Sequence, residues 1–484
     1  MDKKGQSALF TDYYALTMSQ GYWKHAPERH AVFEMSFRRQ PFGGGYTIFA
    51  GLGTLLESLS GFSFSQEDIE YVKNLGGFED GFIEYLKNFR FTGSLWAVDE
   101  GTVVFPQEPL IRVRGNLIEC QLIEAMLLNT VNFQSLIATK TRRVWLASGK
   151  GSVMEFGLRR AQGPDGALSA SRAAFIGGAI GTSNTLAGKL FGIPVMGTMG
   201  HSWVMSFHNE EEAFDAYAGL YPERTVFLID TYDTVKSGVL NAIKAGKKLD
   251  AQGKKFGVRL DSGDIEYLSA EVRRLLDEAG FNDASITVSN ELDETIIETL
   301  VRLGAPVDTW GVGTNMVTGG DDAALTGVYK MSACEDKNGN LKPVMKFSDT
   351  PEKTTNPGIK QIWRLRDNNG SPVADVLAVD GPGEAEIFEQ GGRYCFWHTS
   401  GDYRHFFHEI GTEPEPMLKM RLNKGARVGP RLSLAEIRSA CGYALESFDS
   451  TYKRLHKPSV YKVSMTEKVR SLKLELINSF VNNM

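Results

Sequence analysis

The sequence predicts an α/β protein whose central part forms a barrel-like sheet of parallel strands. Between residues 152 and 313 the chain alternates short apolar runs with helix-like segments. Strands buried on both faces and alternating with helices are typical of a parallel sheet. Polar, glycine-rich residues follow nearly every run, as in α/β barrels, whereas a doubly wound sheet gathers its chemistry at one switch point. These two observations favour the barrel.

The first region, residues 1–135, predicts a mixture of helices and strands. Residues 11–25 carry apolar side chains at helical spacing, with Thr11 or Asp12 as a possible N-cap. Residues 31–39 alternate as a half-buried strand does, and PFGGG then turns the chain. Short strands separated by Gly and Pro are expected at 95–98, 102–105 and 110–113, before a buried helix at 117–128.

The barrel is expected within residues 136–344. Its strands are predicted from six apolar runs, at 152–157, 193–198, 225–230, 255–260, 285–290 and 307–313. Helices are predicted between most of them, for example at 265–279 and 293–303.

The third region, residues 345–484, predicts strands followed by two helices. Residues 358–380 indicate a β-hairpin that turns at Asn369–Gly370. A further strand is expected within 413–422, and amphipathic helices at 433–446 and 466–480. We expect this region to pack with the N-terminal region, because no long polar linker separates it from the barrel.

Composition excludes several classes of protein. The 484 residues include 53 Lys and Arg against 59 Asp and Glu, a net charge of −6 that argues against a nucleic-acid binder. Four scattered cysteines without a CxxC pair predict neither a disulfide framework nor a zinc site. No apolar run reaches about 18 residues and no signal peptide opens the chain, so we expect a cytoplasmic protein with no membrane partner.

Acidic residues follow two neighbouring runs of the predicted barrel. Asp261 and Asp264 follow the run at 255–260, and Asp230 and Asp233 follow the run at 225–230. Such carboxylates can hold ribose hydroxyls or Mg²⁺, and we assign Asp230 and Asp233 as candidate Mg²⁺ ligands. The alternative is that they cap the helices that follow.

Basic and small residues follow other runs. Arg259 lies inside an apolar strand run, where a charge should be paired or functional, and Arg159 lies at a strand exit. Their guanidinium groups can bind carboxylate or phosphate, although Arg159 also fits a solvated surface position. Gly313 and Thr314 belong to a glycine-rich turn that can bind phosphate or simply turn the chain. His201 follows another run and is either catalytic or a structural hydrogen-bonding residue.

Taken together, these segments resemble the nicotinate phosphoribosyltransferase family. The resemblance spans roughly residues 10–360 through TDYYALTMSQGYW, FEMSFRRQPFGG, GLRRAQGPDGALSAS, GTMGHSWVMSF, LIDTYD, GVRLDSGD, GVGTNMVT and PEKTTNPG. It implies an irregular, type II phosphoribosyltransferase-like α/β barrel with an α+β domain formed by the N- and C-terminal regions. It also implies a homodimer with shared sites that joins nicotinate to 5-phosphoribosyl-1-pyrophosphate (PRPP), with coupled ATP hydrolysis, in the first step of NAD salvage from nicotinate.

The resemblance implies roles for individual residues. Tyr14 of the partner subunit and Phe156 would face the two sides of the nicotinate ring. Thr198 and Arg259 would contact nicotinate, Thr314 would contact PRPP, and His201 would be phosphorylated. Without the resemblance, Tyr14 is most simply a core or interface residue that could also stack on a flat ligand.

The chemistry of the implied reaction fits these residues. Displacement of pyrophosphate develops positive charge on the ribose, which a carboxylate such as Asp261 can stabilise, while Mg²⁺ and Arg neutralise the leaving group. The nicotinate nitrogen attacks without a general base, so positioning is the main task of the protein. Two alternatives stay open here: a nicotinamide phosphoribosyltransferase, and a non-catalytic barrel module that binds phosphate and base. The neutral Asn184 before Thr185 favours an acid over an amide substrate.

Overall fold

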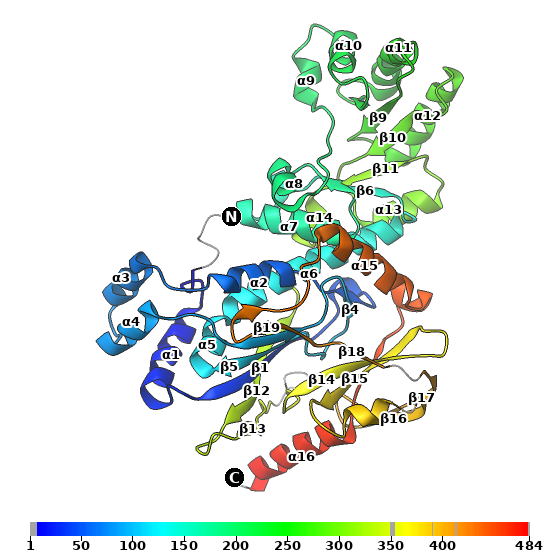
Figure 1. Cartoon of the computed structure of the whole chain (residues 1–484). Helices are drawn as coiled ribbons and strands as arrows, with labels where there is room; N and C mark the ends of the chain where they lie inside the picture. Colours follow the sequence, from blue (N-terminus) through cyan, green and yellow to red (C-terminus); the bar gives the residue numbers. More distant parts are fainter. Residues whose placement is uncertain (1–6, 349–353, 390, 412–413, 483–484) are drawn as a thin grey trace. The chain divides into compact units, whose positions relative to one another are not determined.

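The computed structural model describes residues 7–348, 354–389, 391–411 and 414–482. They form two compact units, which are described separately (Figure 1). Unit 1 comprises residues 1–136 and 324–484, and unit 2 comprises residues 137–323. The three-part division expected at residues 135 and 344 stays a prediction of domain boundaries.

Unit 2 contains a six-stranded parallel sheet in the order β7-β6-β11-β10-β9-β8. Its strands are β6 (Ser152–Glu155), β7 (Gly181–Thr182), β8 (Thr225–Leu228), β9 (Phe256–Leu260), β10 (Ser285–Val288) and β11 (Thr309–Val312). This is the cyclic order of a barrel, because the last strand, β11, pairs with the first, β6. Among the described residues no pairing joins β7 to β8, so the sheet is a half-barrel that is open at that point.

The strand predicted at residues 193–198 is wrong, and this segment lies at the open point of the sheet. Residues 193–198 form no strand and contribute only a single bridge, between Val195 and Thr182. Pro194 accepts a hydrogen bond from the Thr182 N–H through its carbonyl, but it has no N–H of its own to extend a ladder. The strand that does occupy this edge, β7, has two residues and gives no apolar run.

Helices follow the strands of unit 2, as expected. The predicted helices at 265–279 and 293–303 are confirmed as α12 (Ile265–Glu278) and α13 (Glu294–Arg302). Asp264 caps α12 and Asp293 caps α13 through their side chains. The other helical segments are η3 (Leu158–Arg160), α7 (Gly163–Gly177), α8 (Thr185–Phe191), α9 (His201–Met205), α10 (Glu210–Leu220), η4 (Thr234–Gly238), α11 (Val239–Asp250) and α14 (Thr314–Thr318).

Unit 1 combines both ends of the chain in one seven-stranded sheet, ordered β13-β12-β1-β5-β3-β19-β20. β1 pairs on one side with β5, which is nearby in sequence, and on the other side with β12. The strands are β1 (His30–Phe37), β3 (Ser94–Ala97), β5 (Ile111–Asn116), β12 (Gly327–Glu335), β13 (Leu341–Pro343), β19 (Lys419–Asn423) and β20 (Ala426–Arg427). A small pair, β2 (Thr47–Ile48) and β4 (Val103–Val104), accompanies them.

A second sheet of unit 1 has the order β17-β16-β21-β15-β14-β18. The predicted hairpin is confirmed: β14 and β15 are antiparallel, and Gly370 closes the turn by donating its N–H to the Asp367 carbonyl. Gly370 has φ +81°, a conformation that favours glycine. The strands are β14 (Lys360–Arg366), β15 (Pro372–Val379), β16 (Gly392–His398), β17 (Arg404–Ile410), β18 (Glu415–Pro416) and β21 (Lys462–Met465).

The helices expected at 11–25, 433–446 and 466–480 are confirmed, whereas α2, α3 and α4 were not expected. The single helix expected at 117–128 is wrong, because α5 ends at Leu122 and α6 begins at Glu124. The helical segments are α1 (Tyr13–His25), η2 (Pro41–Gly43), α2 (Leu52–Ser60), α3 (Gln66–Leu75), α4 (Asp80–Lys87), α5 (Leu117–Leu122), α6 (Glu124–Ala147), η6 (Ala385–Phe388), α15 (Leu434–Glu446), η7 (Ser450–Lys453) and α16 (Glu467–Asn482). The boundary between the units falls within α6, whose residues from 137 on belong to unit 2. No described helix is both long and apolar enough to cross a bilayer.

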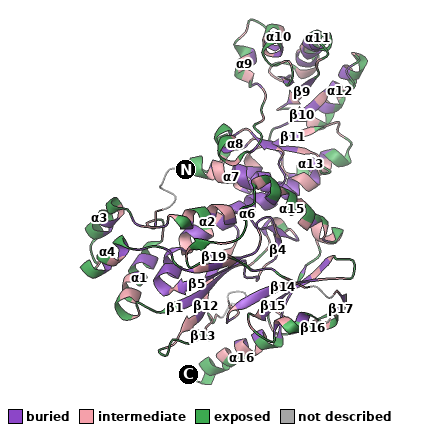
Figure 2. Ribbon diagram, viewed as in Figure 1, coloured by how far each residue is buried: buried purple, intermediate pink, exposed green. Residues whose placement is uncertain are grey.

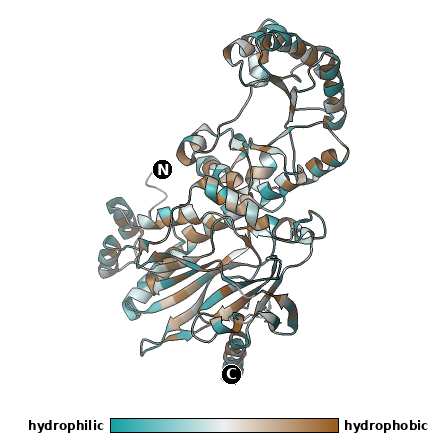
Figure 3. Cartoon of the chain, turned by 45° about the vertical axis from the view of Figure 1, so that its right-hand side comes forward, coloured by the Kyte–Doolittle hydropathy of each residue, from teal (hydrophilic) through white to brown (hydrophobic). Residues whose placement is uncertain are grey.

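Both units bury their strands. The strands are mostly buried (purple in Figure 2), and hydrophobic residues are frequent along them (brown in Figure 3). In unit 2, Trp310 of β11 is only 2% exposed. In unit 1, Phe33 and Tyr329 stack across the β1–β12 pair with ring centroids 4.9 Å apart. Burial of these apolar side chains supplies the main driving force for folding.

A buried polar cluster lies in unit 1 beside the second sheet. The Arg364 guanidinium donates to both carboxylate oxygens of Asp375, at 2.9 and 2.6 Å, and the Tyr461 hydroxyl donates to the same carboxylate. Glu108 is buried near Asp375, and its Oε2 accepts the Phe105 N–H at 2.9 Å. Burial, with the Asp375 charge nearby, raises the pKa of Glu108 well above its ordinary value.

This cluster predicts a pH dependence of stability. Because the folded pKa of Glu108 is raised, its contribution is fully present below the unfolded pKa, near 4.5, and is lost as the pH rises toward the folded pKa. Glu108→Gln keeps a neutral group there, so its unfolding free energy relative to wild type should grow by about 1.4 kcal/mol per pH unit across that window. Urea unfolding at several pH values measures the difference. The exposed Glu386→Gln serves as the control, and a pH-independent difference for Glu108→Gln would contradict the raised pKa of Glu108.

Candidate active site

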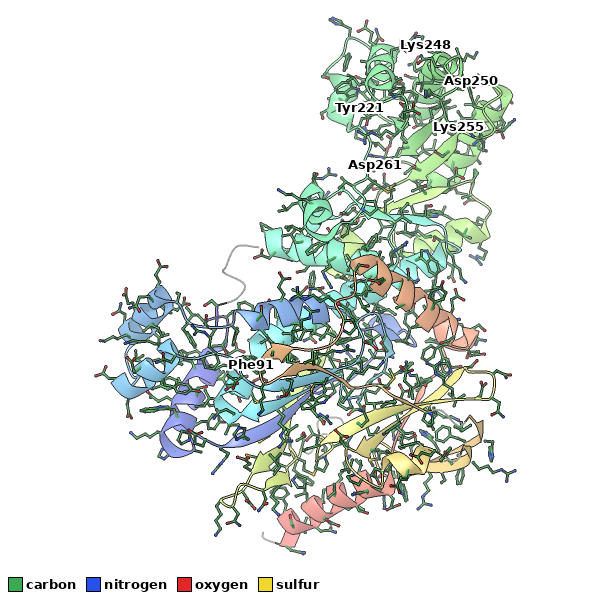
Figure 4. All side chains as sticks on the ribbon, viewed as in Figure 1. Phe91, Tyr221, Lys248, Asp250, Lys255 and Asp261 are labelled. Atoms are coloured by element: carbon green, nitrogen blue, oxygen red, sulfur yellow. The ribbon has the colours of Figure 1, made fainter. Side chains whose placement is uncertain are left out.

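The parallel sheet of unit 2 brings several predicted residues to one edge. Because all six strands run in the same direction, the residues that follow their carboxyl ends meet at the same edge of the sheet. Asp261 lies on the loop directly after β9 (Figure 4). Asp230 and His201 approach it from other loops, and Arg259 approaches it from β9 itself.

Arg259 is the central cation of this cluster. Its side chain is 14% exposed, and one terminal nitrogen donates to the Thr198 hydroxyl at 2.5 Å. The other terminal nitrogen lies 3.7 Å from Asp261 Oδ2. Burial lowers the pKa of Arg259, while Asp261 and Asp230 oppose this shift, and the group stays charged. Its buried Nε has no acceptor among the described residues, so a donor is left for a ligand.

Asp230 ties the loops after β8 and β9 together. Its Oδ2 accepts the Asp261 backbone N–H at 2.8 Å and the Ser262 hydroxyl at 2.6 Å. Its Oδ1 is buried and accepts no hydrogen bond from the described residues. Asp230 therefore positions Asp261 and keeps one carboxylate oxygen available.

Asp261 is held from two sides. Its Oδ1 accepts a hydrogen bond from the Ser289 hydroxyl, at the end of β10. Its Oδ2 lies 3.7 Å from both Arg259 and the His201 Nε2. The sequence did not single out Ser289, although it directly follows β10, because a serine carries no distinctive signal until its neighbour across the sheet is known.

His201 begins α9 with its side chain 40% exposed. Its Nδ1 lies 3.2 Å from the Thr231 hydroxyl, which fixes one side of the ring. The Nε2 faces Asp261 beyond hydrogen-bonding distance. The ring is thus oriented, with one nitrogen engaged and the other directed toward the carboxylate.

Phe156 and the glycine-rich turn lie at the ends of β6 and β11. The Phe156 N–H donates to the Val312 carbonyl, and a Cβ added to Gly311 would lie 2.6 Å from the Phe156 ring. The glycine at 311 is therefore needed to seat this ring. Gly313 and Thr314 follow directly, at the start of α14.

Arg159 lies nearby on η3. Its side chain is exposed, and it is close enough to Arg259 for the two charges to repel, which contributes to the lowered pKa of Arg259. An anion bound at this edge would relieve that repulsion.

The assignment of Asp230 and Asp233 as Mg²⁺ ligands stays a prediction. The Asp233 carboxylate accepts the N–H groups of Val235 and Lys236, so it caps the π-helical turn η4. Asp264 likewise caps α12. In the described part of the chain, no group of three or more His, Cys, Asp or Glu side chains could hold a metal ion by itself. Asp230 is the carboxylate with an oxygen left over.

Tyr14 belongs to unit 1 and is half exposed, at 49%. Its hydroxyl donates to Glu124 Oε2 at 2.9 Å, and partial burial together with Glu124 raises the pKa of Tyr14 to about 12. The phenol is therefore neutral and anchored by its hydroxyl, and part of its surface is accessible.

Comparisons with known proteins agree with the resemblance. Family models of the nicotinate phosphoribosyltransferase N-terminal domain, family and C-terminal domain match residues 9–132, 152–372 and 359–473. The nicotinate phosphoribosyltransferase of Bacillus subtilis is 40% identical over 483 residues, covering 98% of this chain and 96% of that protein. The chain belongs to the nicotinate phosphoribosyltransferase family. The predicted family is thus confirmed.

Solved structures confirm the fold of this phosphoribosyltransferase family member. The crystal structure of human nicotinic acid phosphoribosyltransferase superposes with a TM-score of 0.84 at 30% identity, covering 96% of this chain and 99% of that one. A nicotinate-nucleotide pyrophosphorylase from Pyrococcus furiosus shares the fold at 22% identity, with a TM-score of 0.67 and coverage of 92% and 95%. The predicted type II phosphoribosyltransferase-like fold is confirmed. Of the PEKTTNPG stretch, residues 351–353 lie outside the described residues.

The double acceptor role of Asp230 predicts a stability effect. Asp230→Asn removes the charge that strengthens two hydrogen bonds, so it should lower the unfolding free energy by about 1–2 kcal/mol. Asp264→Asn is the matched control, because Asn and Asp cap helices about equally well, and it should change stability by less than about 0.5 kcal/mol. Urea unfolding measures both, and equal effects would show that Asp230 does no more than a cap.

Proposed function

We propose that this protein joins nicotinate to PRPP, giving nicotinate mononucleotide and pyrophosphate with coupled ATP hydrolysis, as the first step of NAD salvage from nicotinate. The observation that carries the proposal is Arg259: a largely buried guanidinium, held by Thr198 and Asp261, with a donor nitrogen left over. A planar cation in that setting suits a carboxylate-bearing ring.

The same arginine favours nicotinate, which carries a carboxylate, over nicotinamide, which carries an amide. A carboxylate gains a charge-assisted hydrogen bond from Arg259, whereas the neutral amide of nicotinamide does not. Asn184 contributes less directly to this substrate preference than its place in the sequence suggested. It is buried, it caps α8 through its Oδ1, and its amide nitrogen lies 3.3 Å from the Ser171 hydroxyl.

The displacement itself needs positioning and charge stabilisation. As pyrophosphate leaves the anomeric carbon, the ribose becomes positively charged, and Asp261 offers the carboxylate that favours this charge. The ring nitrogen of nicotinate supplies the electron pair of the new bond, so no side chain removes a proton. Phe156 on one face and Tyr14 of the partner subunit on the other would hold the ring in line for attack.

Phosphate groups need separate partners. Arg159, Gly313 and Thr314 are the candidates for PRPP at the edge where β6 and β11 end. Asp230 fits Mg²⁺, because its Oδ1 is a buried carboxylate oxygen without a donor. Mg²⁺ characteristically takes one or two carboxylates together with substrate phosphates, and when bound it would neutralise the pyrophosphate. Asp233 caps η4 through its Oδ1, so we assign Asp230 as the first protein ligand and the Asp233 Oδ2 as a second candidate.

His201 is the proposed phosphoryl acceptor from ATP. The electron pair of its Nε2 would form the N–P bond while the bond from the γ-phosphorus to the bridging oxygen breaks and ADP leaves. In the tautomer that this step requires, Nδ1 carries the proton and donates it to the Thr231 hydroxyl 3.2 Å away, so that Nε2 keeps its electron pair, with Asp261 beside it.

We also propose a homodimer in which Tyr14 of the partner subunit completes each site. The exposed aromatic surface of α1 supports this, because Tyr13, Tyr14 and Met18 are all more than one-third exposed there. We place the protein in the cytoplasm, where its four free cysteines suit a reducing environment.

Purified protein with PRPP, ATP and labelled nicotinate or nicotinamide tests the function. Nicotinate should be strongly preferred, and Arg259→Ala should remove roughly 1.5–3 kcal/mol of that preference, by lowering kcat/KM for nicotinate while leaving nicotinamide nearly unchanged. Arg302→Ala, an exposed arginine at the end of α13, is the charge-matched control. Equal use of both bases would indicate the nicotinamide enzyme, and binding without product would indicate a non-catalytic module.

A labelling experiment tests His201. Incubation with γ-labelled ATP and Mg²⁺ should give an acid-labile, base-stable label that His201→Ala abolishes, because only a phosphoramidate has that stability. The variant should keep slow transfer from PRPP but lose its stimulation by ATP. His208→Ala, an exposed histidine in the same segment, should retain the label. Label or full ATP stimulation in His201→Ala would overturn the assignment.

A further inference from the structure

Unit 1 contains a cavity that the proposed reaction does not use. It has a volume of about 740 Å³, within the usual range of small-molecule sites. Residues of β16, β17, β21 and α16 line it, and none of its described lining residues belongs to unit 2. These elements lie in the part of the chain coloured yellow to red in Figure 1.

Lys473 of α16 is the cation of this cavity. Its side chain is 9% exposed, and its Nζ donates to Asn356 Oδ1 at 3.1 Å and to the Thr399 carbonyl at 3.0 Å. Within the described ranges no carboxylate lies within 4.0 Å of this nitrogen. Burial lowers the pKa of Lys473, and the more distant Asp402 charge opposes that shift. A buried ammonium held by neutral oxygens is costly, and an anion in the cavity would compensate its charge.

An aromatic wall faces the same cavity. His398 and Tyr403 stack with ring centroids 4.5 Å apart and an interplanar angle of 13°, and His405 lies edge-on to both. Burial lowers the pKa of both histidines, so their rings are neutral at neutral pH. Tyr403 is 52% exposed, which leaves room for a further flat group against this stack.

The charges of the lining favour an anion. Lys462 adds a second ammonium, and Asp402 adds one carboxylate that can accept hydrogen bonds from hydroxyl groups. We propose that this cavity binds a small molecule that joins an anionic group to a flat aromatic ring, with the anion against Lys473 and the ring against the His398–Tyr403 stack. This inference is independent of the reaction proposed above.

Equilibrium dialysis of the full-length protein tests the proposal with three probes: AMP (ring and anion), adenosine (ring only) and inorganic phosphate (anion only). Wild type should bind AMP at least tenfold more tightly than either fragment. Lys473→Met should lose one bound AMP per chain. Lys468→Met, which removes an exposed ammonium from the same helix, should bind AMP as wild type does.

A second variant separates a local effect from misfolding. Tyr403→Ala alters an exposed side chain and leaves Lys473 in place, so it should weaken AMP at least fivefold and leave phosphate unchanged. Thermal unfolding midpoints establish that each variant is folded. Two results would overturn the site. One is equal AMP binding by wild type and Lys473→Met, and the other is that none of the three probes loses affinity when Lys473 is replaced. Phosphate binding as tight as AMP would overturn the aromatic part of the assignment.

Discussion

The parallel pairing of β11 with β6 determines how the rest of unit 2 is arranged. It joins the last strand of that segment to the first, so each strand except the two at the open point has its neighbours in cyclic order. Because the strands are parallel, their carboxyl ends converge, and residues from four separate loops reach one another. Trp310 is buried at this pairing, and the glycine after it lets the Phe156 ring lie against β11.

Much of this arrangement could be predicted from the sequence, for a physical reason. Central strands of a parallel sheet are largely buried on both faces, so five of the six expected runs are rich in apolar residues, and each of the five contains a strand. The exception, at 193–198, contains Pro194 and cannot form a ladder, while two-residue β7 lacks the length to give a signal.

The sequence singled out the charged members of this cluster but not all of its hydroxyl groups. Arg259, Asp261 and His201 have distinctive chemistry that can be recognised within or just after an apolar run. Ser289 and Thr231 matter only through the side chains they contact, and those contacts depend on strand order. For Asp233 the sequence left two roles open, because a carboxylate that caps a helix and one that binds a ligand look alike in a sequence, and the structure shows the cap.

The position of β12 has a consequence for how the chain is made. β1 lies between β5 and β12, yet the whole of unit 2 is synthesised before β12 exists. At 5–20 residues per second the ribosome needs roughly 10 to 40 s for that interval. Throughout it, one edge of β1 carries unpaired N–H and C=O groups that another strand could capture. Unit 1 is therefore completed only late in translation, after unit 2 has been synthesised.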